Sequence, residues 1–358
     1  MRAGDVLNGY TLLADFSVVG AGLSRWTLAR KGGREYFLKE FLQPTYPEAD
    51  APGSEAIKAK KRARCAAFEA RHRAMQTALA PLSAYGGNLI VTLDFFRAGA
   101  KYYKATERVH AEDLDVTAIA ALPFRQRLVL LKSMAHSLKI LHDLRIVHGD
   151  LKPDNVLVKR TELGYTSKLI DFDNAYVAGE PPPAAEIVGT INYYSPELLA
   201  YIQEDESVDP RSLGTASDVF ALGLIFSEYL TGRVPAYDPG YGEPAVAVRS
   251  GVVLHVDRAA LDPGLADLVD RMLLADPAAR PTIGDVHAAL MAVRSPGDAP
   301  AAAPTPARTT APAPVRSGAL RGKLVGGGGS APAPAPAPAA TGGLRGKLLG
   351  RSPHDGRR

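Results

Sequence analysis

The sequence predicts an α+β fold followed by a tail that does not fold, and three observations support this prediction. Residues 10–42 contain short apolar and β-branched segments separated by turns, as strands do. Several later segments place apolar residues three and four positions apart, which is typical of amphipathic helices. Beyond residue 294, Ala, Pro, Gly and Thr dominate, and this composition cannot bury enough apolar area to fold.

The predicted elements follow one another in a simple order. Strands are expected at residues 10–13, 26–29, 36–41, 89–96 and 102–106. Helices are expected at residues 54–79, 124–142, 263–274 and 283–293. The folded part is therefore expected to end near residue 294.

Charge is distributed unevenly between the folded part and the tail. The 358 residues carry a formal net charge of +4. Residues 295–358 contribute nine Lys/Arg and two Asp, a net of +7, which leaves −3 for residues 1–294. Because the positive charge lies in a segment that cannot form a core, the basic pI does not indicate a nucleic-acid partner.

Membrane insertion and export are not expected either. The longest apolar run, Val219–Leu230, is shorter than the roughly 20 residues that a bilayer-spanning helix needs, and it contains Ser227 and Glu228. No apolar signal region follows the first residues. The single cysteine, Cys65, excludes an internal disulfide, and the expected location is the cytoplasm.

Two short polar stretches read as the ends of buried strands, at residues 148–155 and 170–173. The first contains an Asp, a Lys two residues on and an Asn three residues further, and the second supplies another Asp. Transfer of a phosphoryl group from a nucleotide needs such groups, because positioning and charge neutralisation carry its rate.

In this interpretation Asp150 accepts the proton of the acceptor hydroxyl, Lys152 contacts the γ-phosphate, and Asn155 and Asp171 hold Mg²⁺. These stretches resemble those of the eukaryotic-like Ser/Thr protein kinases, and the resemblance covers residues 10–294. It implies a bilobal protein-kinase-like fold with ATP and Mg²⁺ in a cleft, and a protein as the substrate.

Three further motifs carry the same resemblance. Gly189–Glu197 resembles the G-T-x-x-Y-x-A-P-E end of a kinase activation segment, with serine in place of the alanine. The family pattern implies that Thr190 helps to seat a Ser or Thr acceptor beside the catalytic Asp and Lys. It also implies that Glu197 pairs with Arg280 in the interior and that Asp218 braces the catalytic loop.

The nucleotide-binding residues are implied by position. Gly20 and Gly22 lie where kinases have a phosphate-covering hairpin, although the third glycine of that pattern is missing. Lys39 lies in a strand resembling V-A-I-K, whose lysine contacts the α- and β-phosphates and pairs with a helix glutamate. Glu69 is the expected partner, and Glu55 is the alternative.

The segment after the fifth strand resembles the hinge between two lobes. Thr106 takes the gatekeeper position, and Glu107 and Val109 are expected to offer backbone groups to the adenine. The N-lobe would then span residues 1–109 and the C-lobe residues 110–294.

Two departures from the kinase pattern affect regulation and the metal site. Gly149 replaces the arginine that, in many kinases, clamps a phosphorylated activation loop, so we expect activity that does not depend on activation-loop phosphorylation. Asp173 replaces the glycine after Asp171-Phe172. The added carboxylate either stiffens the segment or serves as a further metal ligand.

Two other functions compete with a Ser/Thr protein kinase of bacterial signalling or stress response. Small-molecule phosphotransferases of the aminoglycoside and choline kinase type also use H-G-D-x-x-x-x-N followed by I-D-F, but Lys152 and Arg280 are not expected in them. A pseudokinase scaffold that binds nucleotide or a partner is favoured by the incomplete glycine loop. The complete set of catalytic residues disfavours it.

The tail contains one repeated segment. Residues 317–324 (SGALRGKL) recur as residues 341–348 (TGGLRGKL), with six of eight positions identical. This repeat is either chance slippage in a low-complexity region or a duplicated docking motif for a partner, in which two weak sites gain by effective concentration. Ser317 and Thr341 are candidate self-phosphorylation sites.

Overall fold

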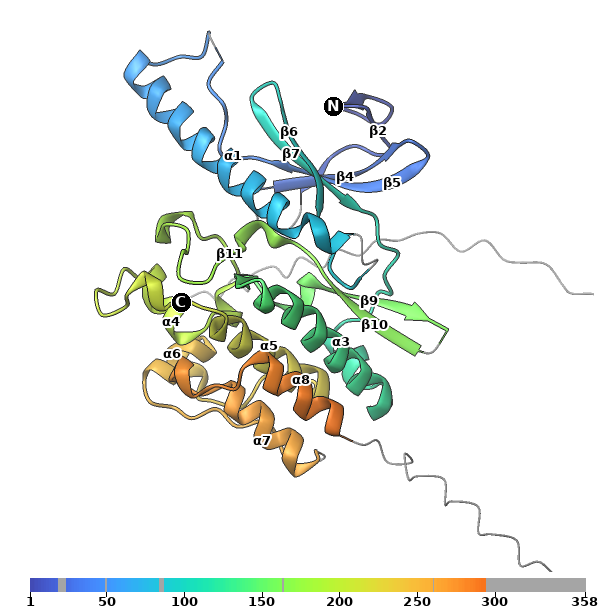
Figure 1. The fold of residues 1–358 in the computed structure, drawn as a ribbon, viewed down its shortest axis with the longest axis vertical. Coiled ribbons are helices and arrows are strands. Elements are labelled where there is room, and N and C mark those ends of the chain that lie inside the picture. The colour runs from blue at the N-terminus through green and yellow to red at the C-terminus, as the bar shows by residue number, and fades with distance from the viewer. Residues whose placement is uncertain (19–23, 49, 84–86, 163, 260, 294–358) are drawn as a thin grey trace, which may run out of the picture. The chain divides into compact units, whose positions relative to one another are not determined.

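The computed structural model describes residues 1–18, 24–48, 50–83, 87–162, 164–259 and 261–293 (Figure 1). Met1–Ser295 forms one compact unit. The predicted tail, with both copies of the repeated segment, lies outside the described residues.

An antiparallel sheet of seven strands forms the first part of this unit (Figure 1). Its order is β1-β2-β4-β5-β7-β6, and β3 pairs with β4. A tight turn joins β4 to β5, where Gly32 and Gly33 both have positive φ, as a two-residue type I′ hairpin requires. The strands are β1 (Val6–Leu7), β2 (Tyr10–Leu12), β3 (Ser17–Val18), β4 (Ser24–Lys31), β5 (Arg34–Phe41), β6 (Thr92–Ala98) and β7 (Lys101–Glu107).

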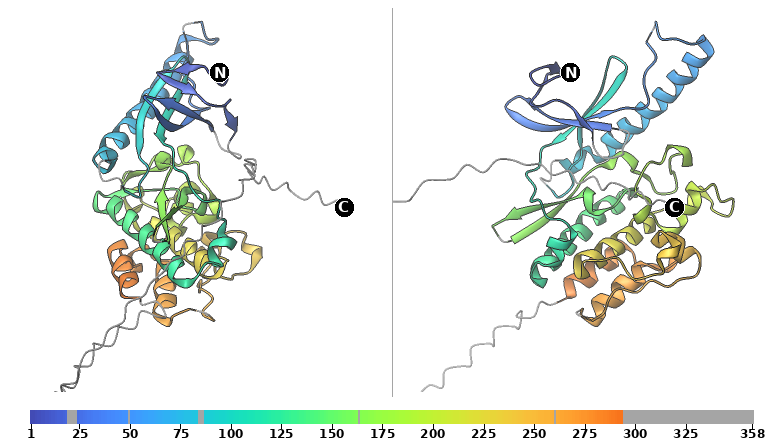
Figure 2. Two further views of the ribbon diagram at one scale, coloured as in Figure 1. Left: turned by 90° about the vertical axis from the view of Figure 1, so that its right-hand side faces the viewer. Right: turned by 180° about the vertical axis from the view of Figure 1, so that it is seen from behind.

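Helix α1 (Glu55–Ser83) runs beside this sheet and contacts β6 (Figures 1 and 2). Only a narrow stripe of the helix is apolar, and its buried Cys65 joins Phe41, Phe95 and Tyr102 in one small core. The other faces carry mostly charged, exposed residues. The helix is therefore held to the sheet along one seam.

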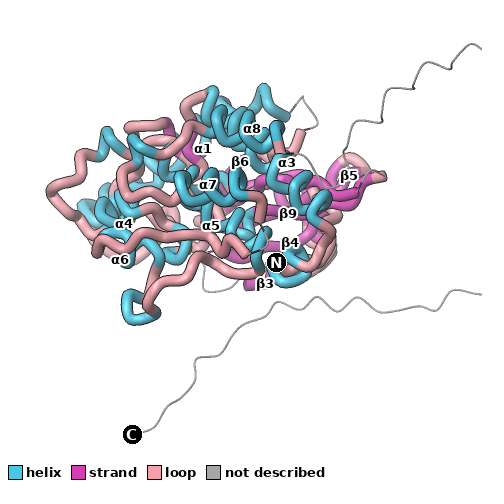
Figure 3. Tube along the Cα trace, turned by 90° about the horizontal axis from the view of Figure 1, so that it is seen from below, coloured by secondary structure: helices cyan, strands magenta, loops and turns pink. Residues whose placement is uncertain are grey.

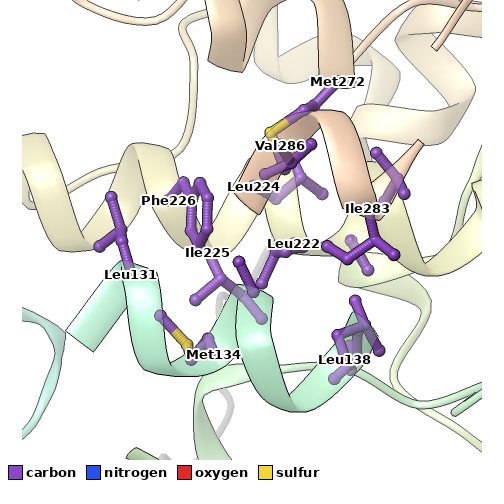
Figure 4. Close-up of a cluster of buried hydrophobic side chains, with 14 of the residues drawn as sticks. Leu131, Met134, Leu138, Leu222, Leu224, Ile225, Phe226, Met272, Ile283 and Val286 are labelled. Carbon is purple, nitrogen blue, oxygen red and sulfur yellow. The ribbon is translucent and has the colours of Figure 1, made fainter. Parts of the chain in front are cut away.

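The second part of the unit is helical. Helix α5 is buried on nearly all sides, as expected for a helix at the centre of a domain. Side chains of α3, α5, α7 and α8 interdigitate in the main core (Figure 4), and Figure 3 shows these helices grouped together. The helices are α2 (Val116–Ala120), α3 (Phe124–Asp143), α4 (Pro196–Ile202), α5 (Ala216–Thr231), α6 (Pro244–Arg249), α7 (Pro263–Met272) and α8 (Ile283–Ala292).

Two small antiparallel pairs and several single turns of 3-10 helix carry the polar stretches. The pairs are β9 (Val156–Thr161) with β10 (Gly164–Leu169), and β8 (Ile146–Val147) with β11 (Tyr176–Val177). Leu169 accepts from the N–H of Ile90 and donates to the carbonyl of Asn88, which ties β10 to the segment entering β6. The 3-10 turns are Pro153–Asn155, Phe172–Asn174, Ala184–Glu186, Ile191–Tyr193, Pro210–Ser212, Pro239–Tyr241 and Pro277–Ala279.

The predicted α+β fold is confirmed, with differences at the ends of elements. The helix predicted at residues 54–79 continues to Ser83 with Pro81 inside its last turns, and the helix predicted at residues 263–274 ends at Met272. None of the helices in the described part of the chain is both long and apolar enough to cross a bilayer.

Candidate active site

A cavity of about 930 Å³ lies where the sheet meets the helical part. Of the predicted site residues that the structure describes, all except Glu69 line it: Lys39, Glu107, Val109, Asp150, Lys152, Asn155, Asp171 and Thr190. Gly20 and Gly22 lie outside the described residues. Segments that are far apart in the sequence therefore bring the predicted polar groups to one cleft.

Asp218 fixes the backbone of the loop that carries Asp150. Its carboxylate is 2% exposed and accepts from the backbone N–H of His148 at 2.7 Å and of Gly149 at 3.1 Å. His142 Nε2 lies 3.0 Å from the same carboxylate. Because Asp218 belongs to the buried helix α5, the loop is anchored to the main core.

Gly149 is required by the backbone geometry of this loop. Its φ is +76°, a conformation that favours glycine. A Cβ at this position would lie 2.5 Å from the carbonyl oxygen of Asn174. The absence of the usual arginine here therefore goes with a local conformation that leaves no room for a side chain.

Asp150, Lys152 and Thr190 form one hydrogen-bonded group. Lys152 Nζ donates to Thr190 Oγ1 at 2.7 Å and lies 3.2 Å from Asp150 Oδ2. The backbone N–H of Thr190 donates to Asp150 Oδ1 at 3.3 Å. The carboxylate is thus placed in the cleft with a cation and a hydroxyl at its side, although Thr190 is forty residues away in sequence.

Asn155 and Asp171 offer the oxygen ligands that Mg²⁺ prefers. Asn155 donates from Nδ2 to the backbone oxygen of Asp150 at 2.7 Å and to its Oδ2 at 3.1 Å. Burial opposes ionisation of Asp171, but Lys104 and Lys39 outweigh it and hold the pKa of Asp171 well below its usual value. The donor set is therefore an amide and an ionised carboxylate, which fits a magnesium ion.

The predicted ion pair between Lys39 and Glu69 is wrong in this structure. Lys39 Nζ donates to Asp171 at 2.9 and 3.1 Å and to Asp173 at 2.7 Å. Glu69 instead accepts from the hydroxyl of Tyr102 at 2.7 Å, because it projects from a different side of α1 than the face that lines the cavity. The alternative, Glu55, is exposed at the start of α1 and pairs with Arg62.

Asp173 therefore acts in a way that the sequence did not indicate. It binds two lysines, Lys39 and Lys104. Burial alone would lower the pKa of Lys39, but Asp173 and Asp171 outweigh it and raise that pKa. Lys104 was not predicted as a site residue, although a lysine between Tyr103 and Ala105 in an apolar strand was a usable signal.

Two ion pairs hold the activation segment, residues 171–197, one at its end and one inside it. Glu197 accepts two hydrogen bonds from the fully buried guanidinium of Arg280, at 2.7 and 2.9 Å, as predicted. Near the middle of the segment, Glu186 pairs with Arg71 of α1 at 2.6 Å. This second pair was not predicted, because nothing in the sequence indicates that residue 186 faces α1.

Comparison with known proteins identifies the family. A family model described as the protein kinase domain matches residues 55–291, more than half of the chain. This chain belongs to the protein kinase domain family. The match begins at α1, so the first five strands and Lys39 lie outside it.

The kinase domain is also similar to curated proteins from bacteria and plants. Serine/threonine-protein kinase pkn2 of Myxococcus xanthus is 30% identical over 239 residues, which are 62% of this chain and 28% of that protein. The serine/threonine-protein kinase drp72 of Corynebacterium efficiens is 32% identical over 225 residues, 60% of this chain and 39% of that protein. A calcium and calcium/calmodulin-dependent serine/threonine-protein kinase of Lilium longiflorum is 30% identical over 159 residues, which are 44% of this chain and 29% of that protein. The matched regions thus span well under half of each relative.

Proposed function

We propose that this kinase domain is an ATP-dependent Ser/Thr protein kinase, which transfers the γ-phosphoryl group of ATP to a protein hydroxyl. The observation that carries the proposal is the contact between Lys152 and Thr190 beside Asp150. It places a cation and a hydroxyl where an acceptor Ser or Thr would meet the transferring phosphoryl group.

Each residue of the cleft has a distinct part in this proposal. Asp150 orients the acceptor hydroxyl and takes its proton, and Lys152 stabilises the charge on the γ-phosphate oxygens. Lys39 contacts the α- and β-phosphates. Asn155 and Asp171 are the residues that would hold Mg²⁺, which supplies positive charge to the phosphate oxygens.

The adenine end of the cleft is formed by the last residues of β7 and the segment that follows it. Thr106 is half-buried at the gatekeeper position, and the Glu107 side chain is exposed. The backbone of Glu107 and Val109 would bind the adenine edge, so their side chains need no specific chemistry.

The proposal includes activity without phosphorylation of the activation segment. Phosphate-dependent kinases order this segment through an arginine that binds the phosphate, and Gly149 stands in its place. Between Asp171 and Gly189 the segment contains no Ser or Thr. The Glu186–Arg71 ion pair supplies a permanent carboxylate–guanidinium link to α1, which is the type of contact that a phosphate would otherwise make.

The natural substrate is a protein, and the repeated RGKL segment of the tail is proposed as a docking motif for a partner. Two bacterial relatives are named as serine/threonine-protein kinases, and we propose a role in bacterial signalling or stress response. Mapping of phosphate at Ser317 and Thr341 after incubation with ATP would test whether the tail is phosphorylated by its own cleft or by that of another copy.

The experiment that tests the activity offers the enzyme labelled ATP with two kinds of acceptor, a generic basic protein and a mixture of aminoglycosides and choline. We expect label on Ser or Thr of the protein and none on the small molecules. Label on the small molecules alone would favour the small-molecule phosphotransferases. Nucleotide binding with no transfer to either acceptor would favour a pseudokinase.

A further inference from the structure

Four charged side chains form a closed network in the cleft. Lys39 donates to Asp171 at 2.9 and 3.1 Å and to Asp173 at 2.7 Å. Lys104 donates to Asp171 Oδ1 at 2.7 Å and to Asp173 Oδ1. Each lysine therefore contacts both carboxylates, and each carboxylate contacts both lysines.

The strand register explains why both carboxylates are needed. Lys39 of β5 and Lys104 of β7 are directly paired across the sheet, and like charges at such positions destabilise a sheet. The Lys104 side chain is only 4% exposed, so its charge requires a carboxylate partner. One carboxylate between two lysines would leave a net positive charge, whereas two carboxylates balance it.

Helix α1 does not supply the carboxylate that Lys39 needs. The residues of α1 that line the cleft are Arg64, Phe68, Arg71 and His72, and none of them is acidic. Glu69 is occupied by Tyr102. Active kinases require the strand lysine to be held by a helix glutamate, and this cleft has an aspartate from the activation segment in that role.

We propose that Asp173 and Lys104 are a positioning pair that takes over the task of the helix glutamate. Asp173 orients Lys39 toward the phosphates, and Lys104 balances the added negative charge. With Asp173 present, the lysines share two carboxylates, so Asp171 Oδ2 accepts only from Lys39 and keeps a lone pair for Mg²⁺. Because the pair comes from β7 and the activation segment, Lys39 is positioned without any contribution from α1.

This inference rests on the proposed kinase function for its catalytic consequence, and its test therefore measures binding as well as turnover. The full chain is compared with Asp173→Asn, Lys104→Met and the double variant Lys104→Met/Asp173→Asn. Glu69→Gln is the matched comparison, since it also removes one carboxylate near the cleft. The readouts are the Kd of a non-hydrolysable ATP analogue, the Mg²⁺ concentration for half-maximal binding, and the urea midpoint.

Asp173→Asn is expected to weaken analogue binding and to raise the required Mg²⁺ concentration, each by roughly 10- to 100-fold, the usual effect of losing a group that orients a metal ligand. Glu69→Gln is expected to change either value by less than about twofold. The double variant is expected to bind better than Asp173→Asn, because removal of Lys104 releases Asp171. A purely structural role of Asp173 would move the urea midpoint and leave the Mg²⁺ dependence unchanged.

Weaker analogue binding in Glu69→Gln together with wild-type binding in Asp173→Asn would overturn the inference. Additive effects of the Lys104 and Asp173 changes on the Kd of the analogue would overturn it as well. If Lys104→Met fails to fold, the comparison of Asp173→Asn with Glu69→Gln still tests whether Asp173 or Glu69 positions Lys39. A wild-type protein that binds the analogue but transfers no phosphate would refute the kinase function alone. A wild-type protein that binds no nucleotide would refute both.

Discussion

Replacing Asp218 by Asn should damage both the stability and the turnover of the kinase domain. The change keeps the size of the side chain but leaves one carbonyl oxygen where there were two carboxylate oxygens. In the wild type, the backbone N–H of Gly149 donates to Asp218 Oδ1 at 3.1 Å. If the remaining oxygen of Asn keeps the bonds to His148 and His142, the new NH₂ group faces this N–H of Gly149. Two donors then oppose each other in the interior.

The magnitude follows from this geometry. A buried N–H without an acceptor costs about 1–3 kcal/mol, so the free energy of unfolding should fall by this amount. The same N–H holds the loop that carries Asp150. A displacement of that loop by about 1 Å can cost about 100-fold in rate, and kcat should fall by this order.

The assay combines urea denaturation with initial rates of phosphate transfer at saturating ATP. The control is Asp262→Asn at the start of α7, where Asp262 caps the helix by accepting from Leu265 N–H at 3.1 Å. Asn is an equally good N-cap, so this variant should keep both stability and rate. Wild-type turnover in a folded Asp218→Asn protein would refute the argument that Asp218 holds the catalytic loop.

Three further predictions concern ion pairs and pH. Arg280→Met should lower the free energy of unfolding by about 3–5 kcal/mol in urea titrations, because it leaves Glu197 buried without its cation; a loss below about 1 kcal/mol would contradict this. Burial raises the pKa of Glu228 to about 7. Between about pH 4.5 and pH 7 the folded state therefore keeps Glu228 protonated while the unfolded state loses that proton, so the free energy of unfolding falls as pH rises. Glu228→Gln should therefore raise the free energy of unfolding at pH 8, by on the order of 1–2 kcal/mol after solvent screening, and leave it unchanged at pH 4. An equal gain at both pH values would exclude this cause. Glu186→Gln removes the ion pair with Arg71, and it should lower kcat several-fold while the free energy of unfolding falls by under about 1 kcal/mol. Phosphatase treatment of the wild type should not change kcat. Inactivation by phosphatase would show that the activation segment depends on a phosphate.

Residues that are close in sequence could be assigned to the site before the structure. Asp150, Lys152 and Asn155 lie within six residues, so their spacing alone brings them to one loop. Thr190 and Arg280 are distant, and they were assigned from motif resemblance. The structure brings Thr190 to within 3.3 Å of Asp150 and pairs Arg280 with Glu197.

The partner of Lys39 could not be predicted, because it depends on the rotation of a helix about its axis. One residue along a helix turns the side chain by about 100°, so a glutamate beside the buried stripe can face either the cleft or a strand tyrosine. Lys104 could be noticed from the sequence as a lysine in an apolar strand, but its partners could not be predicted. Its pairing with Lys39 depends on the register between β5 and β7, which no local pattern of residues 101–107 specifies.

The most direct test of the central claim is intact-mass spectrometry of the kinase and a generic acceptor protein, before and after incubation with Mg²⁺ and ATP. The wild type is compared with Asp150→Asn, in which the proton acceptor is lost and the side-chain volume is kept. We predict phosphoryl mass increments with the wild type and none with Asp150→Asn. Equal increments with both proteins would contradict the assignment of Asp150, and no increment with either would contradict the proposed phosphoryl transfer.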